Sequence, residues 1–144
     1  MNRQFSLAGL LRLRQAEQKA AESGLAAANM RSSSLRERRA EARTALGESA
    51  DSAGSVGDSA TLLAIAAARA SSQGMLAELD ALAALAETEA AAAQDGYTEA
   101  RRRAVGLEKL ESRHDAAFVA AELRAEQGAL DEIASAGWHR KAGS

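Results

Sequence analysis

The chain has 144 residues, among them 38 alanines but no proline, no cysteine and only four aromatic side chains. Residues 1–50 carry nine basic and five acidic side chains, residues 51–100 one and eight, and residues 101–144 eight and seven. This composition is typical of long helices rather than compact cores, excludes disulfides and thiolate metal sites, and offers no run of 18 apolar residues that would span a membrane.

The first predicted helix covers residues 6–46. Ser6 is a favourable N-cap, and Phe5 before it is placed to pack on Leu10 as a hydrophobic staple. Eight of twelve positions spaced four and three residues apart are apolar, which is a moderate heptad signal. These seam positions are Leu7, Leu11, Arg14, Gln18, Ala21, Leu25, Ala28, Ser32, Leu35, Arg39, Ala42 and Leu46.

Residues 47–57 are rich in Gly, Ser and Asp, have no period and predict a loop. Asp58 or Ser59 can cap the helix that follows, which we predict over residues 59–136. Twelve of its fourteen seam positions are apolar. They are Leu62, Ile65, Arg69, Ser72, Leu76, Leu79, Ala83, Ala86, Ala90, Ala93, Tyr97, Ala100, Ala104 and Leu107.

The pattern changes after Leu110. A shifted seam through Leu123 predicts a stutter between these two leucines. Its positions are Leu123, Gln127, Leu130 and Ala134. Residues 137–144 are predicted to be a frayed tail.

Two long helices joined by a short loop pack antiparallel. We therefore predict an all-α fold, a long two-helix antiparallel coiled-coil hairpin that forms a single domain over residues 1–144. Folding near residue 52 lays the basic first helix against the acidic stretch 58–100, so that opposite charges flank the seam. The first helix is shorter, at about 60 Å against about 115 Å. Residues beyond about Val105 are therefore expected to overhang without a partner, and their apolar stripe predicts a binding surface.

The titratable residues do not suggest catalysis. The histidines are His114 and His139, and His114 lies near the seam, where packing is the expected role. Catalytic carboxylates are buried and have a perturbed pKa, whereas a helical hairpin buries little. The acidic side chains considered are Glu108, Glu111, Asp115 and Glu122. We predict that the protein is not an enzyme and has no catalytic residues, no cofactor and no metal ligands.

Basic clusters at residues 36–39 and at Arg101–Arg103 are expected to form solvated helix faces, with an acidic protein surface as the alternative ligand. The negative net charge argues against nucleic acid. Trp138 is either an anchor for a partner or part of an end with no role. The N-terminus lacks the layout of a signal peptide, so a cytoplasmic location is expected.

Three groups of residues, in order along the chain, resemble the flagellar FliJ family, and the resemblance covers the whole length of the chain. The opening group is Phe5, Leu7, Leu10, Leu11 and Arg14. The second, within residues 97–114, is Leu107, Glu108, Lys109, Leu110 and Arg113. The third is Glu126 and Gln127 followed by Leu130, Asp131, Glu132, Ile133 and Ala134.

The resemblance implies a cytoplasmic component of the flagellar type III export apparatus, peripheral on the inner membrane at the flagellar base and required for motility. It implies a coiled coil similar to the central stalk of rotary ATPases. The implied partners are the hexameric export ATPase FliI, the export-gate protein FlhA and export chaperones. Such a protein would promote assembly and activity of the ATPase ring and couple it to the gate, without nucleic acid and without membrane insertion.

The resemblance, together with the predicted overhang, also gives the candidate ATPase-binding residues. These are Leu107, Glu108, Lys109, Leu110, Arg113, Gln127, Leu130, Asp131, Glu132 and Ile133. The alternative is a generic structural or scaffolding coiled coil with no motor role, since its seam would look the same.

Overall fold

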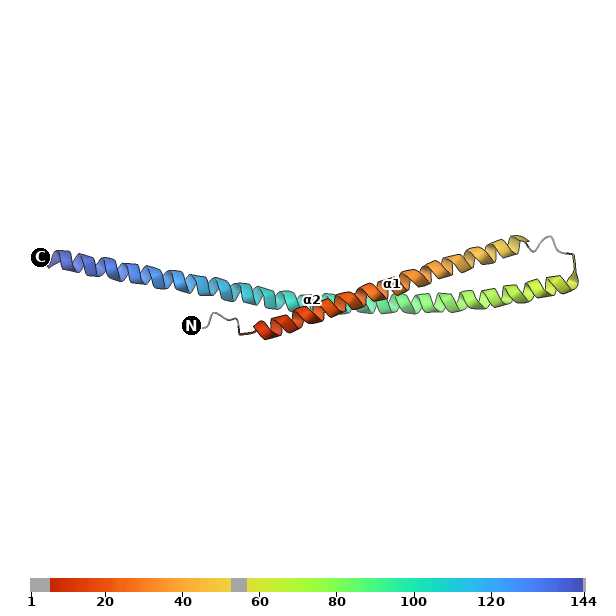
Figure 1. Cartoon of the computed structure of the whole chain (residues 1–144), viewed down its shortest axis with the longest axis horizontal. Helices are drawn as coiled ribbons and strands as arrows, with labels where there is room; N and C mark the ends of the chain where they lie inside the picture. Colours follow the sequence, from red (N-terminus) through yellow and green to blue (C-terminus); the bar gives the residue numbers. More distant parts are fainter. Residues whose placement is uncertain (1–5, 53–56, 144) are drawn as a thin grey trace. The chain divides into compact units, whose positions relative to one another are not determined.

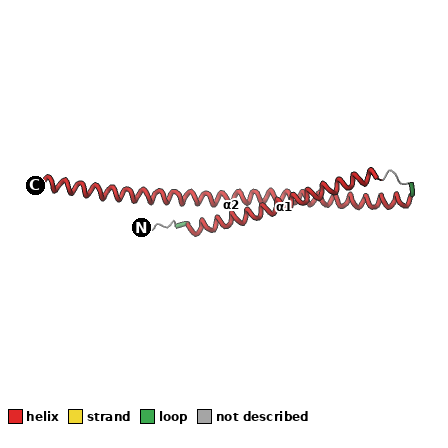
Figure 2. Tube along the Cα trace, turned by 45° about the horizontal axis from the view of Figure 1, so that its top comes forward, coloured by secondary structure: helices red, strands yellow, loops and turns green. Residues whose placement is uncertain are grey.

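The computed structural model describes residues 6–52 and 57–143. It contains two long helices, α1 (Ala8–Ser52) and α2 (Ser59–Ala142), packed against each other as a hairpin (Figures 1 and 2). The predicted all-α hairpin is thereby confirmed. The chain divides into two compact units. We call residues 18–99 the loop unit, and residues 1–17 with 100–144 the terminal unit. The single domain over residues 1–144 stays a prediction.

The first turn of α1 starts one residue later than predicted. The amide of Leu11 donates a hydrogen bond to the carbonyl of Leu7 at 2.9 Å. The residue whose carbonyl accepts the first helical hydrogen bond is the N-cap, so Leu7 rather than Ser6 holds that position. The predicted partner of the hydrophobic staple, Phe5, lies outside the described residues.

The end of α1 differs more, because the helix continues to Ser52 instead of stopping at Leu46. Ala50 is half-buried four residues after Leu46, so the seam gains one further position here. A glycine inside a helix, here Gly47, costs about 1 kcal/mol relative to alanine. Packing along the seam offsets that cost. This stabilising contribution could not be predicted from the composition of the segment alone. The predicted loop over residues 47–57 was therefore too long, and residues 53–56 lie outside the described part.

The start of α2 agrees with the sequence and selects one of the two predicted caps. The Asp58 carboxylate accepts hydrogen bonds from the Ala60 amide through Oδ1 at 3.3 Å and from the Thr61 hydroxyl through Oδ2 at 3.1 Å. The Asp58 carbonyl accepts the first helical hydrogen bond, from Leu62, at 2.9 Å. Asp58 therefore satisfies an amide that the helix itself leaves without a partner.

The predicted frayed tail is wrong, because α2 runs to Ala142. Its last turn carries His139, Arg140 and Lys141, and cationic side chains there interact favourably with the helix dipole. Nε of Arg140 donates to the Ala136 carbonyl at 3.4 Å, and the Gly143 amide to that of His139 at 3.1 Å. These bonds satisfy two carbonyls in the last turns of the helix.

The burial pattern of the loop unit confirms the predicted seam. Its buried residues are Ala28, Ser32, Ala83 and Ala86. Nearly all other seam positions of this unit are half-buried, the exceptions being Leu62 and Ser72, which are exposed. No large side chain in the described residues is fully buried. The core is thus a thin line of small residues, along which two helices can approach closely.

The terminal unit has its own seam, with Leu11 and Ala104 buried. After Leu107 the half-buried residues Glu111, His114 and Phe118 continue the same alternation of four and three residues, and Ala120 is half-buried as well. The predicted stutter is therefore absent as far as Phe118. The seam passes through two polar residues here, so an apolar pattern could not trace it.

Charge pairing across the loop unit agrees with the predicted apposition of a basic and an acidic helix. Asp80 of α2 accepts from Arg43 of α1 at 3.2 Å and lies 3.8 Å from Nε of Arg39. Exposed pairs of this kind contribute about 0.2–1 kcal/mol each, so they select the register more than they stabilise the fold.

Candidate partner-binding site

The first helix reaches further along α2 than the sequence predicted. Within the terminal unit, Nε2 of Gln15 donates to Oε1 of Glu108 at 3.3 Å. Half-burial on α2 continues to Ala120, and from there to Ala142 every side chain is exposed apart from the position of Gly137. The overhang, which we define as residues 121–142, thus begins about four helical turns beyond the predicted Val105.

The predicted site residues consequently fall into two groups, the first of which lies where α1 still contacts α2. Leu107 is half-buried, which contradicts its predicted place beyond the reach of the first helix. Glu108 accepts the hydrogen bond from Gln15. Lys109, Leu110 and Arg113 are exposed. A groove on this part of α2 is lined by Arg102, Arg103, Gly106, Leu107 and Leu110.

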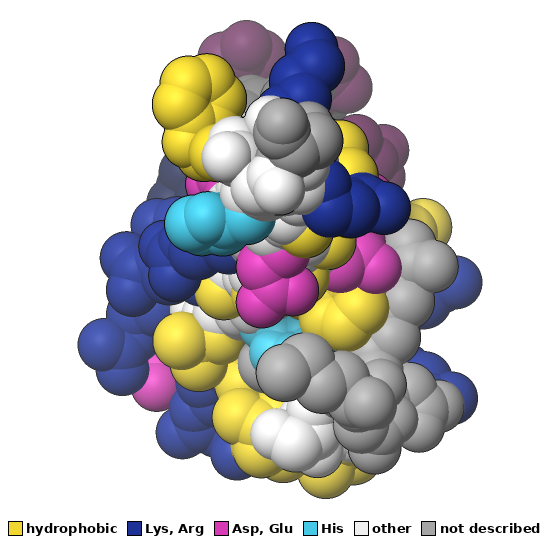
Figure 3. Space-filling model, turned by 90° about the vertical axis from the view of Figure 1, so that its left-hand side faces the viewer, with side chains coloured by type: hydrophobic (Ala, Val, Ile, Leu, Met, Phe, Trp, Pro, Cys, Tyr) yellow, Lys and Arg dark blue, Asp and Glu magenta, His cyan; other side chains and the backbone are white. Residues whose placement is uncertain are grey.

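The second group lies on the overhang, and all its members are exposed. They are Gln127, Leu130, Asp131, Glu132 and Ile133. Leu130 is 61% exposed and Ile133 67%. Figure 3, which faces the end where α2 terminates, shows hydrophobic side chains at the surface among charged ones. Leu130 and Ile133 are therefore available to a partner without any rearrangement of the pairing between α1 and α2.

Two further apolar residues extend this surface and were not among the predicted site residues. Val119 is 52% exposed and Leu123 is 61% exposed. At about 100° per residue, Val119, Leu123, Leu130 and Ile133 lie within an arc of roughly 80° on α2. We call these four residues the apolar stripe. Continuing the period of four and three backwards from Leu130 would have found both additions.

The stripe does not continue the seam of the terminal unit. Helical geometry places it roughly a third of a turn around α2 from Leu107, Glu111, His114 and Phe118. The sequence pattern suggested a stutter because the apolar positions move to another face of α2. This change of face coincides with the point on α2 where the contact with α1 ends. Since α2 is one uninterrupted helix, the change lies in the sequence pattern and not in the backbone.

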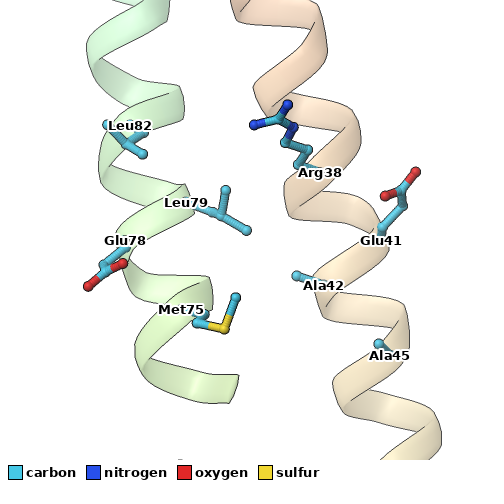
Figure 4. A pocket seen from close by; sticks show the side chains of 8 residues that line it. All are labelled: Arg38, Glu41, Ala42, Ala45, Met75, Glu78, Leu79 and Leu82. Atoms are coloured by element: carbon cyan, nitrogen blue, oxygen red, sulfur yellow. The ribbon is translucent and has the colours of Figure 1, made fainter. Parts of the chain in front are cut away.

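A second apolar surface lies in the loop unit, in a groove between the two helices (Figure 4). Figure 4 shows Leu79 and Arg38 pointing toward the opposite helix, while Glu41 and Glu78 point away. The groove is lined by Arg38, Glu41, Ala42, Ala45, Met75, Glu78, Leu79 and Leu82. It is open and has no histidine, and no carboxylate points into it.

The described residues bring together no three His, Asp or Glu side chains that could hold a metal ion. Within residues 6–52 and 57–143, neither helix contains a segment with the length and apolarity needed to cross a membrane. His114, the histidine near the seam, is half-buried in the terminal unit, as packing there would require.

Two long helices packed along a thin seam of small residues define a two-helix coiled coil. The sequence matches the model of the flagellar FliJ protein over residues 3–143, and the chain belongs to this family. No curated protein and no solved structure matches it. The chain is therefore a non-enzymatic component of the flagellar export apparatus at the flagellar base. The resemblance stated from its end motifs is confirmed.

Proposed function

We propose that the chain binds the hexameric export ATPase FliI through its overhang, promotes assembly and activity of the ATPase ring, and couples it to the export-gate protein FlhA. A role in handling export chaperones belongs to the same proposal. The observation that carries it is the apolar stripe, which α1 leaves uncovered while the rest of the hairpin supplies a folded support.

The energetics favour a partner on this stripe. Fully burying a Leu, Ile or Val side chain is worth about 1.5–3 kcal/mol relative to leaving it exposed. The stripe residues are between 52% and 67% exposed, so covering them recovers about half of that for each. Asp131 and Glu132 lie further around α2, about 80° and 100° from the nearest stripe residue, and charges at the edge of a binding surface orient a partner more than they add affinity.

The residues of the first group have a different part in this proposal. Leu107 stabilises the terminal unit, because it is half-buried against α1. Leu110, which is 44% exposed, and the exposed Lys109 and Arg113 can extend the contact with the ATPase toward the paired region. The binding surface we propose is therefore centred on the overhang and only bordered by the segment from Leu107 to Arg113.

The alternative, a structural coiled coil with no motor role, makes a different prediction about the same residues. A scaffold within the export apparatus would hold other components together without changing the rate of ATP hydrolysis. A chain that acts on the ATPase must both bind it and raise its hydrolysis rate. The two functions therefore separate in an assay with the purified ATPase.

The test replaces two stripe residues, Leu130→Asp with Ile133→Asp. We expect loss of ATPase binding in a pull-down, loss of stimulated ATP hydrolysis and loss of swimming, with unchanged helicity and melting temperature. Leu63→Asp is the matched control, because Leu63 is also on α2, is 73% exposed and lies in the loop unit. Full binding and stimulation by the double variant would remove the overhang from the mechanism.

A further inference from the structure

The stripe is arranged so that it matches a second copy of itself. We propose that two chains associate through residues 119–137 of α2, which pair with the same residues of the other copy as a short antiparallel coiled coil. This association needs no ATPase, so it stands or falls independently of the proposed function. It uses the same surface, and the ATPase would therefore displace the second copy.

The sequence around the stripe has the spacing of a coiled-coil seam. Positions 119, 123, 126, 130, 133 and 137 alternate by four and three residues. Four of them are the stripe residues, and Glu126 and Gly137 occupy the other two. This seam spans about 27 Å at 1.5 Å per residue, which corresponds to five helical turns.

Antiparallel pairing about residue 128 places these positions opposite one another. Leu123 then faces Ile133 of the second copy, Val119 faces Gly137, and Leu130 faces Glu126, so that each pair of residue numbers adds to 256. The six layers that result are related by a two-fold axis, as a self-complementary dimer interface requires.

The positions that flank this seam carry little charge. They are Ala120, Gln127 and Ala134 on one side, and Glu122, Ala129 and Ala136 on the other. In the antiparallel register Glu122 meets Ala136, so no like charges face each other at the flanks. Small flanking side chains also let two helices approach closely. The charged residues Arg124, Asp131 and Glu132 fall outside the contact.

Glu126 determines the orientation of the pair. In a parallel dimer Glu126 would face Glu126 of the other copy in one core layer, and two like charges there are destabilising. In the antiparallel dimer each Glu126 packs its methylene groups against Leu130, and its carboxylate can reach solvent. The antiparallel arrangement is therefore favoured, although two carboxylates near the seam keep the association weak and reversible.

Cysteine crosslinking reads out this geometry directly, because the chain contains no native cysteine. Gln127 lies beside the two-fold axis, so Gln127→Cys is expected to form an interchain disulfide under mild oxidation. With the two-fold axis at residue 128, position 122 lies about 18 Å and position 136 about 24 Å from its own counterpart along the helix axis, far beyond the roughly 7 Å limit between Cα atoms of a disulfide. Glu122→Cys alone and Ala136→Cys alone should stay uncrosslinked, whereas a mixture of the two should crosslink.

Sedimentation equilibrium of the full-length chain measures the strength of association. Glu126→Leu should lower the dissociation constant by at least about tenfold, because it replaces a charge near the seam with an apolar side chain. Leu123→Asp should raise it by at least about tenfold. Leu63→Asp, in the loop unit, serves as the control and should leave it unchanged.

The proposal has two contradicting outcomes. A Glu126→Leu variant that associates no more tightly than the natural chain would show that this face does not pair. Self-crosslinking of Glu122→Cys as fast as that of Gln127→Cys would show parallel pairing and overturn the register. Binding to the ATPase decides neither outcome, because both measurements use the chain alone.

Discussion

The loop unit and the overhang use the same helix in opposite ways. In the loop unit α2 buries the small residues Ala83 and Ala86 against α1, while Leu82 and Leu85 beside them stay about half exposed. On the overhang the seam spacing carries larger residues, such as Leu123 and Leu130, each of which is 61% exposed. Small side chains let the chain pair closely with itself. Large apolar side chains at unpaired positions stay in contact with water. Burying them against another chain would lower the free energy.

The largest effect is expected where the loop unit is tightest. Ala83 is 1% exposed, and Ala83→Asp would place a charge in the closest contact between the helices. We expect a loss of unfolding free energy of about 3 kcal/mol or more, because an unpaired buried charge is strongly destabilising. Chemical denaturation measures the loss. Ala84→Asp, on an exposed neighbouring position, is the control and should cost less than about 1 kcal/mol.

An intermediate effect is expected in the terminal unit, where the sequence assigned Leu107 to the overhang. Since Leu107 is half-buried, Leu107→Asp should destabilise this unit by about 1–3 kcal/mol. Leu110→Asp is the comparison, because Leu110 is 44% exposed and should cost less. Hydrogen exchange of residues 8–17 and 100–118 separates the two variants. Equal protection in both would mean that Leu107 is not part of the seam.

A smaller effect is expected at the start of α2. Asp58→Ala removes the side-chain oxygens that accept from Ala60 and Thr61, and N-cap losses of this kind cost about 0.5–2 kcal/mol. Asp58→Ser should retain most of the stability, since serine caps almost as well. A melting temperature that drops equally for both variants would assign the effect to something other than the cap.

The smallest effect concerns charge pairing in the loop unit. Reversing Arg39 and Arg43 to Glu should lower stability by less than about 1–2 kcal/mol in total, and more at low salt than at high salt. Adding Asp80→Arg to that variant restores opposite charges at the same contact, so stability should recover. If the added substitution lowers the melting temperature further at low salt, Asp80 does not face these two arginines.

The hairpin could be predicted from the sequence because the spacing of the seam residues can be recognised within each helical segment by itself. Every seam position from Leu11 to Leu46 is buried or half-buried, as the spacing of four and three residues required. The helix ends were harder, since Gly47 and the Ser- and Asp-rich residues after it have low helix propensity, yet α1 extends through them. The position at which α1 ends is determined there by pairing with α2. The sequence of this segment taken alone does not contain that information.

The candidate site was predicted only in part, for the same reason. Leu130 and Ile133 are exposed as expected, but the position of the overhang depends on where α1 begins and ends relative to α2. Helix lengths estimated from composition placed that point near Val105, whereas Gln15 reaches Glu108. Polar residues in the seam, Glu111 and His114, concealed the remaining contacts, because apolar periodicity cannot register them.

Hydrogen–deuterium exchange of the full chain, alone and with the hexameric export ATPase, tests the central claim most directly. The chain is measured at a concentration at which sedimentation shows it to be monomeric. We predict that amides of residues 121–137 exchange faster than those of the paired segments in the free chain and become protected with the ATPase. Protection confined to residues 59–99, with no change on the overhang, would contradict the account.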